Sequence, residues 1–284
     1  MTTPAENILF LWNNAVPRGT VSAPEVATLP ASNLQTVQRS EVWRSPSGTS
    51  VDIDITLDSA EEAAVAIAGL VDHNLGPEGK IRLRGWSDAL GGSNQVEDVT
   101  VTPWESVYGY GVGGYGANGY GGALSGQTAS LIRPVTLLPL SDYHDALYWR
   151  MTLTDPDIPY FEAAVPYLGD LHQMANNMSW GWRLRHRPRT RFTESRGGQR
   201  YGAPQRGRFE MDLPFDLMDQ VDKSALWQRY LQIENHNPLI VCARPIGGFE
   251  QLLTSIYCHF EGGLDTADHH VDDTRTTLKL VEEL

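Results

Sequence analysis

Alternating hydrophobic and polar positions run through most of this chain and predict β-strands. The clearest example is 51–58, where Val, Ile, Ile and Leu alternate with three aspartates and a threonine. Successive side chains of a strand point to opposite faces, so this segment predicts a strand with one buried and one solvent-facing side. Similar alternation in 80–87, 146–154 and 208–215 extends the prediction to a mainly β protein.

The stretch 65–71 differs, because apolar or small residues occupy both of its faces. That pattern is typical of a strand covered on both sides. Asn74, Gly76, Pro77 and Gly79 follow and supply turn residues before the next strand at 80–87. We therefore predict that the two strands form a β-hairpin.

One helix is expected, near 217–234, and Asn235-His-Asn-Pro238 would end it. Its apolar residues recur near helical spacing at Leu217, Val221, Leu226, Tyr230 and Ile233. The remaining second half is expected to close with strands at 239–243, 252–260 and 274–281.

Charge divides the chain unevenly. Residues 1–170 contain 8 Lys and Arg against 20 Asp and Glu, whereas residues 171–284 contain 14 against 15. This shift indicates two modules, 1–170 and 171–284, with the boundary after Gly169-Asp170. The acidic first module disfavours binding to nucleic acid or to an anionic membrane.

The remaining bulk features suggest a protein that folds in a reducing compartment. The first residues lack the basic segment of a signal peptide, and no run of about 20 apolar residues predicts a membrane span. Cys242 and Cys258 are the only cysteines, too few for a disulfide framework, and whether they pair stays open.

A Gly/Tyr-rich tract, 108–126, is expected to be an inserted loop. Its GVGGYG segment matches a dinucleotide fingerprint but lacks the strand before it and the helix after it that would hold a pyrophosphate. The tyrosines of the loop are instead candidates for surface contacts, since tyrosine combines an apolar face with a polar tip. They are Tyr108, Tyr110, Tyr115 and Tyr120.

No motif predicts catalysis, a cofactor or a metal. Asp52 and Asp54 share a strand face, where solvated carboxylates are ordinary. The run 268–273, DHHVDD, has suitable ligand types, but neighbours in an extended chain point apart and no second motif completes the set. Cys258 and His259 are adjacent and so face opposite sides of a strand. We therefore expect a protein that is not an enzyme.

Three segments, 31–45, 71–86 and 146–170, together resemble the discoidin-like (galactose-binding-type) jelly-roll β-sandwich of tailed-phage structural proteins. They supply its SNL…WRS segment, its NL…IRL hairpin and its closing YWR…LG pair. Residues 171–284 are similar to the β-barrel module with one helix of phage distal tail proteins, through RFEMDLPF (208–215), NPLIVCARP (237–245) and TLKLVEEL (277–284).

The resemblance implies a virion protein of the phage tail tip or baseplate, assembled in the host cytoplasm. It would form a homo-oligomeric ring, a trimer or hexamer, that joins the tail tube to hub and fibre proteins. The alternative is a carbohydrate-binding module that contacts host glycans. In that case Trp43, Trp86 and Trp104 would join the loop tyrosines in a sugar platform.

The segment 183–208 contains nine arginines and one acid, Glu194. It is either a solvated strand face or an interface, because arginine is enriched at protein–protein contacts and pairs with carboxylates. Nucleic acid inside a tail tube is a third partner, which we rank last. In a ring, these arginines would meet the acidic module of a neighbour. The candidates are Arg183, Arg185, Arg187, Arg189 and Arg191.

Overall fold

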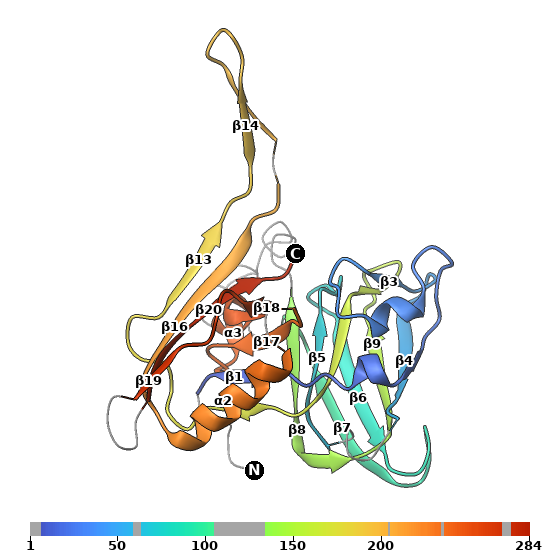
Figure 1. The fold of residues 1–284 in the computed structure, drawn as a ribbon. Coiled ribbons are helices and arrows are strands. Elements are labelled where there is room, and N and C mark those ends of the chain that lie inside the picture. Colours follow the sequence, from blue (N-terminus) through green and yellow to red (C-terminus); the bar gives the residue numbers. More distant parts are fainter. Residues whose placement is uncertain (1–6, 59–63, 105–133, 204, 234–235, 269–273) are drawn as a thin grey trace, which may run out of the picture.

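The computed structural model describes residues 7–58, 64–104, 134–203, 205–233, 236–268 and 274–284. Over these ranges the chain forms antiparallel sheets with two α-helices, which confirms the predicted mainly β fold class (Figure 1). None of the described helices has the length and apolar character needed to cross a bilayer.

Two sheets form a sandwich around the first hydrophobic core. The alternating strand at 51–58 is confirmed, with Val51, Ile53 and Ile55 buried in this core. The outer sheet contains, in order, β2 (Thr20–Ser22), β4 (Ser50–Thr56), β9 (Tyr148–Thr154), β6 (Lys80–Trp86) and β7 (Gln95–Val101). The central sheet contains β11 (Val165–Gly169), β5 (Ala64–Val71) and β8 (Val135–Asp145). Short elements close the sandwich: η1 (Val16–Arg18), η2 (Ala31–Gln35), β3 (Trp43–Arg44) and β10 (Glu162–Ala163).

The predicted hairpin of β5 and β6 is wrong, because the two strands lie in different sheets. β5 pairs with β11 and β8, whereas β6 pairs with β9 and β7. The connection crosses from one sheet to the other. Asp155 holds it by accepting the Gly76 N–H at 2.6 Å, and the Trp104 indole donates to the Leu75 carbonyl at 2.7 Å. The turn residues were correctly recognised, but the turn joins two layers.

A further sheet, the C-terminal sheet, is built mainly from the second half of the chain, which also contributes two helices. Its strand order is β12 (His172–Gln173), β1 (Leu9–Leu11), β17 (Leu239–Cys242), β18 (Ser255–Phe260), β20 (Thr274–Glu282), β16 (Arg208–Met218) and β13 (Arg183–Arg187), with β19 (Thr266–Asp268) also on β20. The helices are α2 (Gln220–Ile233), close to the predicted 217–234, and α3 (Gly248–Thr254), which was not predicted. Over the described residues this sheet is open and not a closed barrel, because β13 runs on into an outer ribbon and does not return to β12.

The first strand of the chain corrects the predicted module 1–170. β1 pairs with β12 and β17, so it belongs to the C-terminal sheet. Its short apolar run is buried on both faces: Ile8, Phe10 and Trp12 enter the C-terminal core, whereas Leu9 and Leu11 face the central sheet. The sandwich is thus inserted between β1 and the rest of its sheet. The division near residue 170 otherwise stays a prediction.

A third core joins the central sheet to the C-terminal sheet. Ile67 and Val71 of β5 pack there with Ile240, Cys242 and Tyr257. The opposite side of β5 packs in the sandwich core, which explains why both faces of this strand are apolar. The two cysteines are free. Cys242 belongs to the joining core and Cys258 to the C-terminal core, so they lie on opposite faces of one sheet.

Gly85 of β6 lies opposite Trp149 of β9. A Cβ at this position would lie 2.7 Å from the Trp149 ring, which is itself fully buried. We expect Gly85→Ala to lower the free energy of unfolding by about 1–3 kcal/mol, because the indole must shift in a packed core. Urea unfolding measures this loss. Gly48→Ala is the control, since its Cβ would meet only ordinary contacts, and equal stability of the two variants would contradict the prediction.

Candidate functional site

A long ribbon extends from the C-terminal sheet into solvent (Figure 1). β13 and β16 pair from Arg183↔Asp212 to Arg187↔Arg208, and beyond this point the chain continues as β14 (Arg191–Glu194) paired with β15 (Arg200–Ala203). We call residues 188–203 the arm. Every residue of β14 and β15 is exposed. The structure therefore presents the arginine-rich segment as a projecting two-stranded arm.

The predicted interface arginines fall into two groups. Arg185 pairs with Asp212 at 2.7 Å, and Arg187 lies 3.2 Å from Glu210, both on the neighbouring strand β16. These two arginines support the ribbon within the chain. Among the described residues, no acid lies within ion-pair distance of Arg183, Arg189 or Arg191, so these three are the ones left for a partner.

The arm also exposes aromatic rings. The side chains of Phe192 and Tyr201 are 59% and 55% exposed, and the Arg200 guanidinium lies 4.9 Å from the centre of the Phe192 ring. Glu194 is its only acid against Arg189, Arg191, Arg196 and Arg200. Aromatic rings beside unpaired arginines are the residue types that dominate protein interfaces.

A sugar platform made of the predicted tryptophans is not present. Trp43, Trp86 and Trp104 are all buried, and the Trp43 indole donates to the Pro24 carbonyl at 3.0 Å. Their rings serve the core, so they offer no flat face to a pyranose. The candidate tyrosines Tyr108, Tyr110, Tyr115 and Tyr120, with the whole loop 108–126, lie outside the described residues.

The acidic candidates are structural where they are described. Asp54 pairs with Arg150 at 2.5 Å, and Asp52 accepts the Thr152 hydroxyl at 2.6 Å. Asp268 pairs with Lys223, while 269–273 lie outside the described residues. Over the described part of the chain, no three His, Cys, Asp or Glu side chains converge as metal ligands.

Ser141, His144 and Glu97 form a cluster that sequence reasoning missed, because Glu97 is 44 residues from Ser141. The same Glu97 oxygen accepts the Ser141 hydroxyl at 2.7 Å and contacts His144 Nε2 at 3.1 Å. Burial raises the pKa of Glu97, but hydrogen bonds from Ser141, the Asp98 backbone and His144 together outweigh burial and the net shift is downward. A serine relay needs the carboxylate and the hydroxyl on different ring nitrogens. In this cluster the carboxylate and the hydroxyl both approach the same ring nitrogen of His144, so its geometry is that of a surface hydrogen-bond network.

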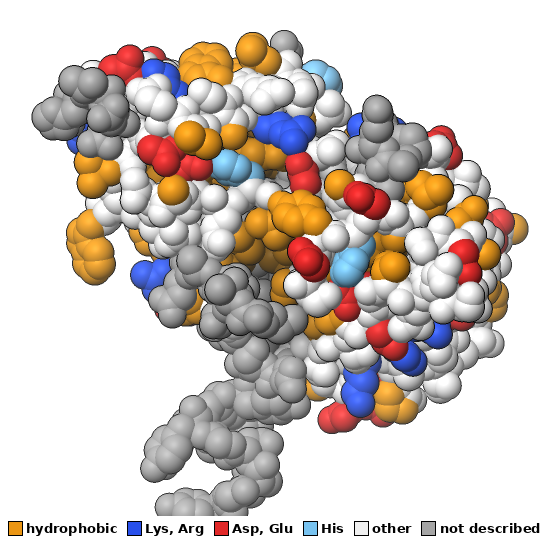
Figure 2. Space-filling model, turned by 90° about the horizontal axis from the view of Figure 1, so that it is seen from below, with side chains coloured by type: hydrophobic (Ala, Val, Ile, Leu, Met, Phe, Trp, Pro, Cys, Tyr) orange, Lys and Arg blue, Asp and Glu red, His pale blue; other side chains and the backbone are white. Residues whose placement is uncertain are grey.

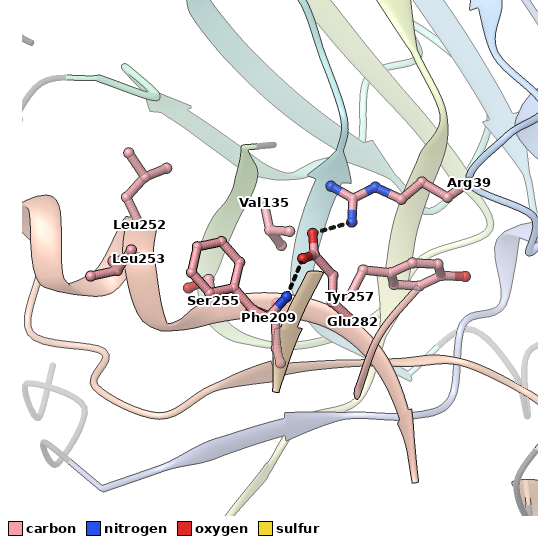
Figure 3. Close-up of a pocket in the computed structure, with 9 residues that line it drawn as sticks. Arg39, Val135, Phe209, Leu252, Leu253, Ser255, Tyr257 and Glu282 are labelled. Atoms are coloured by element: carbon pink, nitrogen blue, oxygen red, sulfur yellow. Dashed lines mark hydrogen bonds and ion pairs between the residues drawn. The ribbon is translucent and has the colours of Figure 1, made fainter. Parts of the chain in front are cut away.

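A small cavity lies where the sandwich meets the C-terminal sheet (Figure 3). Arg39 of the sandwich donates to Glu282 at 2.8 Å, and Glu282 in turn accepts the Phe209 N–H at 2.8 Å. Arg39 also contacts Asp72 at 3.1 Å and donates to the Glu283 carbonyl at 3.0 Å. The cavity measures about 10 Å³, the size of one water molecule, so it is a structural junction and not a ligand pocket.

A wider hollow of about 420 Å³ lies at the base of the arm. Arg187, Arg189 and Arg208 line it together with Glu282 and Glu283. Arg187 and Arg208 both approach Glu210, at 3.2 and 3.4 Å, and His259 lies 3.1 Å from Glu283. The opposing charges leave little net attraction for an anion. This hollow is therefore a weaker candidate site than the arm.

Comparisons with known proteins find similarity to solved structures only. No protein-family model matches the chain, and no curated protein matches it. Three of the similar solved structures each have a TM-score of 0.35. The family 32 CBM of C. perfringens NanJ in complex with galactose is 14% identical and aligns over 56% of this chain and 98% of its own. Reduced XRCC1 bound to the DNA pol beta catalytic domain is 14% identical and aligns over 53% of this chain and 93% of its own. The f-lectin (fucolectin) from Morone saxatilis (striped bass) serum is 12% identical and aligns over 97% of this chain and 93% of its own.

Of these three structures, one is a CBM in complex with galactose and one is a fucolectin, and none of the three is a phage tail protein. The chain's own sheets make it a mainly β protein with a β-sandwich.

Proposed function

We propose that this protein is a structural assembly component that forms an oligomeric ring through its arm. The main observation that supports this proposal is the arm, whose two strands are exposed along their whole length. An isolated two-stranded ribbon is only marginally stable in water. A neighbouring subunit that covers Phe192 and Tyr201 would bury apolar surface and stabilise the ribbon.

Charge supports a second copy of the same chain as the partner. The arm has four arginines against one acid, whereas residues 1–170 carry 20 acids against 8 basic residues. Opposite charges on two surfaces of one chain favour contacts between copies and select their orientation.

The tail-tip setting rests on the sequence resemblance alone. In that setting the ring joins the tail tube to hub and fibre proteins in the virion, and the protein has no catalytic role. The comparisons agree better with the second candidate, a carbohydrate-binding module, since two of the three named neighbours are a galactose complex and a fucolectin. Folds of this kind host many functions, so we keep sugar binding second.

We expect the full chain to form a closed oligomer of fixed size, and Arg189→Glu with Arg191→Glu to reduce it to monomers. These two arginines have no acidic partner among the described residues, so their reversal breaks contacts between copies and leaves Arg185 and Arg187 paired. Mass photometry over a range of protein concentrations measures the outcome. Lys80→Glu with Lys279→Glu is the control, because it makes the same change in net charge on exposed residues outside the arm.

A wild-type chain that stays monomeric at every concentration would overturn the assembly proposal. Isothermal titration of the full chain against host-surface polysaccharides tests the second candidate. Saturable binding at micromolar affinity by a monomeric chain would favour the carbohydrate-binding module.

A further inference from the structure

Three exposed apolar residues lie at the end of the ribbon opposite the arm. Trp180 precedes β13 and is 100% exposed, Leu217 lies at the end of β16 and is 56% exposed, and Val221 in the first turn of α2 is 75% exposed. We call these three residues the foot patch. An exposed tryptophan and two exposed aliphatic residues at one end of an element are the residue types that mark a protein contact.

The foot patch is held in place by hydrogen bonds. Ser179 donates its N–H to the Pro214 carbonyl at 2.7 Å, and its hydroxyl accepts the Asp216 N–H at 2.8 Å. The Asn176 amide donates to the Leu217 carbonyl at 2.8 Å. These bonds tie the loop before β13 to the end of β16, so the indole stands on an ordered turn. An anchor that is already ordered loses less entropy when a partner covers it.

The arm has the complementary chemistry. Trp180 offers the best aromatic face for a cation, and the arm presents Arg189 and Arg191 without acidic partners among the described residues. Phe192 and Tyr201 of the arm match the apolar side chains of the patch. Asp219, partly exposed two residues before Val221, adds a carboxylate whose Oδ1 accepts the Asp222 N–H at 2.7 Å.

The two surfaces cannot meet within one chain. The patch lies at the Met218 end of β16 and the arm begins beyond Arg208, at the other end of this 11-residue strand. At ~3.4 Å per residue the ribbon between them spans roughly 37 Å. Figure 1 shows β14 at the far end of the ribbon from α2.

We propose that the arm of one copy docks on the foot patch of the next copy. This inference rests on the proposed assembly function and names the surface that receives the arm. Because donor and acceptor are different surfaces, the contact is heterologous. Such contacts repeat head to tail and close into a ring when the rotation between subunits permits.

The decisive experiment mixes two variants of the full chain. Trp180→Ala removes the acceptor, and Arg189→Glu with Arg191→Glu removes the donor. Each is expected to weaken self-association at least ~30-fold, as expected when an interface hot spot is lost. An equimolar mixture has one intact arm and one intact patch per pair, so we expect 1:1 heterodimers that grow no further, measured by native mass spectrometry. Leu231→Ala is the control, an exposed apolar residue of α2 outside the patch.

Assembly of Trp180→Ala like wild type, while the arm variant stays monomeric, would place the acceptor elsewhere and overturn this inference but not the assembly function. A mixture that remains monomeric would also overturn it. Undiminished assembly of the arm variant would overturn both. Unchanged thermal unfolding of Trp180→Ala, expected for a fully exposed side chain, separates lost docking from misfolding.

Discussion

Arg39→Met is expected to lower the free energy of unfolding by about 3–5 kcal/mol. Arg39 is 2% exposed, and it joins Asp72 of the sandwich to Glu282 of the C-terminal sheet at 3.1 and 2.8 Å. Methionine fills a similar volume but leaves the Glu282 carboxylate, 7% exposed, without its cation. An uncompensated buried charge is what makes the loss large. Urea unfolding measures the difference.

Two further variants make this prediction specific. Arg39→Met combined with Glu282→Gln removes both charges and is expected to recover much of the lost stability. Arg82→Met breaks the exposed ion pair with Asp98, whose side chains are 47% and 33% exposed, and should cost no more than about 1 kcal/mol. Similar losses for Arg39→Met and Arg82→Met would show that burial of the junction does not matter.

Acidification from pH 6.5 to about 4 is expected to remove about 3 kcal/mol of stability through His73 alone. Burial lowers the pKa of His73 from 6.5 to about 4, although the Asp72 charge partly offsets the effect. The ring bonds to the Thr136 hydroxyl at 2.8 Å, and the lowered pKa keeps it neutral at pH 6.5 in the folded protein. In this pH window the unfolded chain binds a proton that the folded chain does not. The contribution of His73 to the free energy of unfolding is therefore complete above pH 6.5 and is lost as the pH falls. The magnitude follows from 1.36 kcal/mol per pKa unit.

His73→Gln keeps a polar group near Thr136 but cannot titrate. We expect its stability to fall less steeply between pH 6.5 and 4 than that of wild type, measured by urea unfolding at several pH values. His236→Gln is the control, because it makes the same substitution at an exposed histidine. Equal slopes for His73→Gln and wild type would show that His73 is protonated in the folded state.

The apolar pattern of the sequence determined most of the strands. The alternation at 51–58 and the two apolar faces of 65–71 both agree with the structure, because the period of a strand records which of its faces are covered. The pattern does not say what covers them. Only the tertiary structure decided that β5 lies between two cores, that β5 and β6 separate into different sheets, and that β1 joins the C-terminal sheet.

The candidate site divides in the same way. The sequence by itself determined that 183–208 is a basic segment, since composition is local. The structure decided that Arg185 and Arg187 are used within the chain and that Arg189 and Arg191 stand on a projecting arm. Leu217 and Val221 fit a helical apolar pattern yet are exposed, because that pattern does not distinguish a core from a surface patch. Arg39 and Glu282, 243 residues apart, meet only through the packing of three sheets, and no local pattern encodes such a contact.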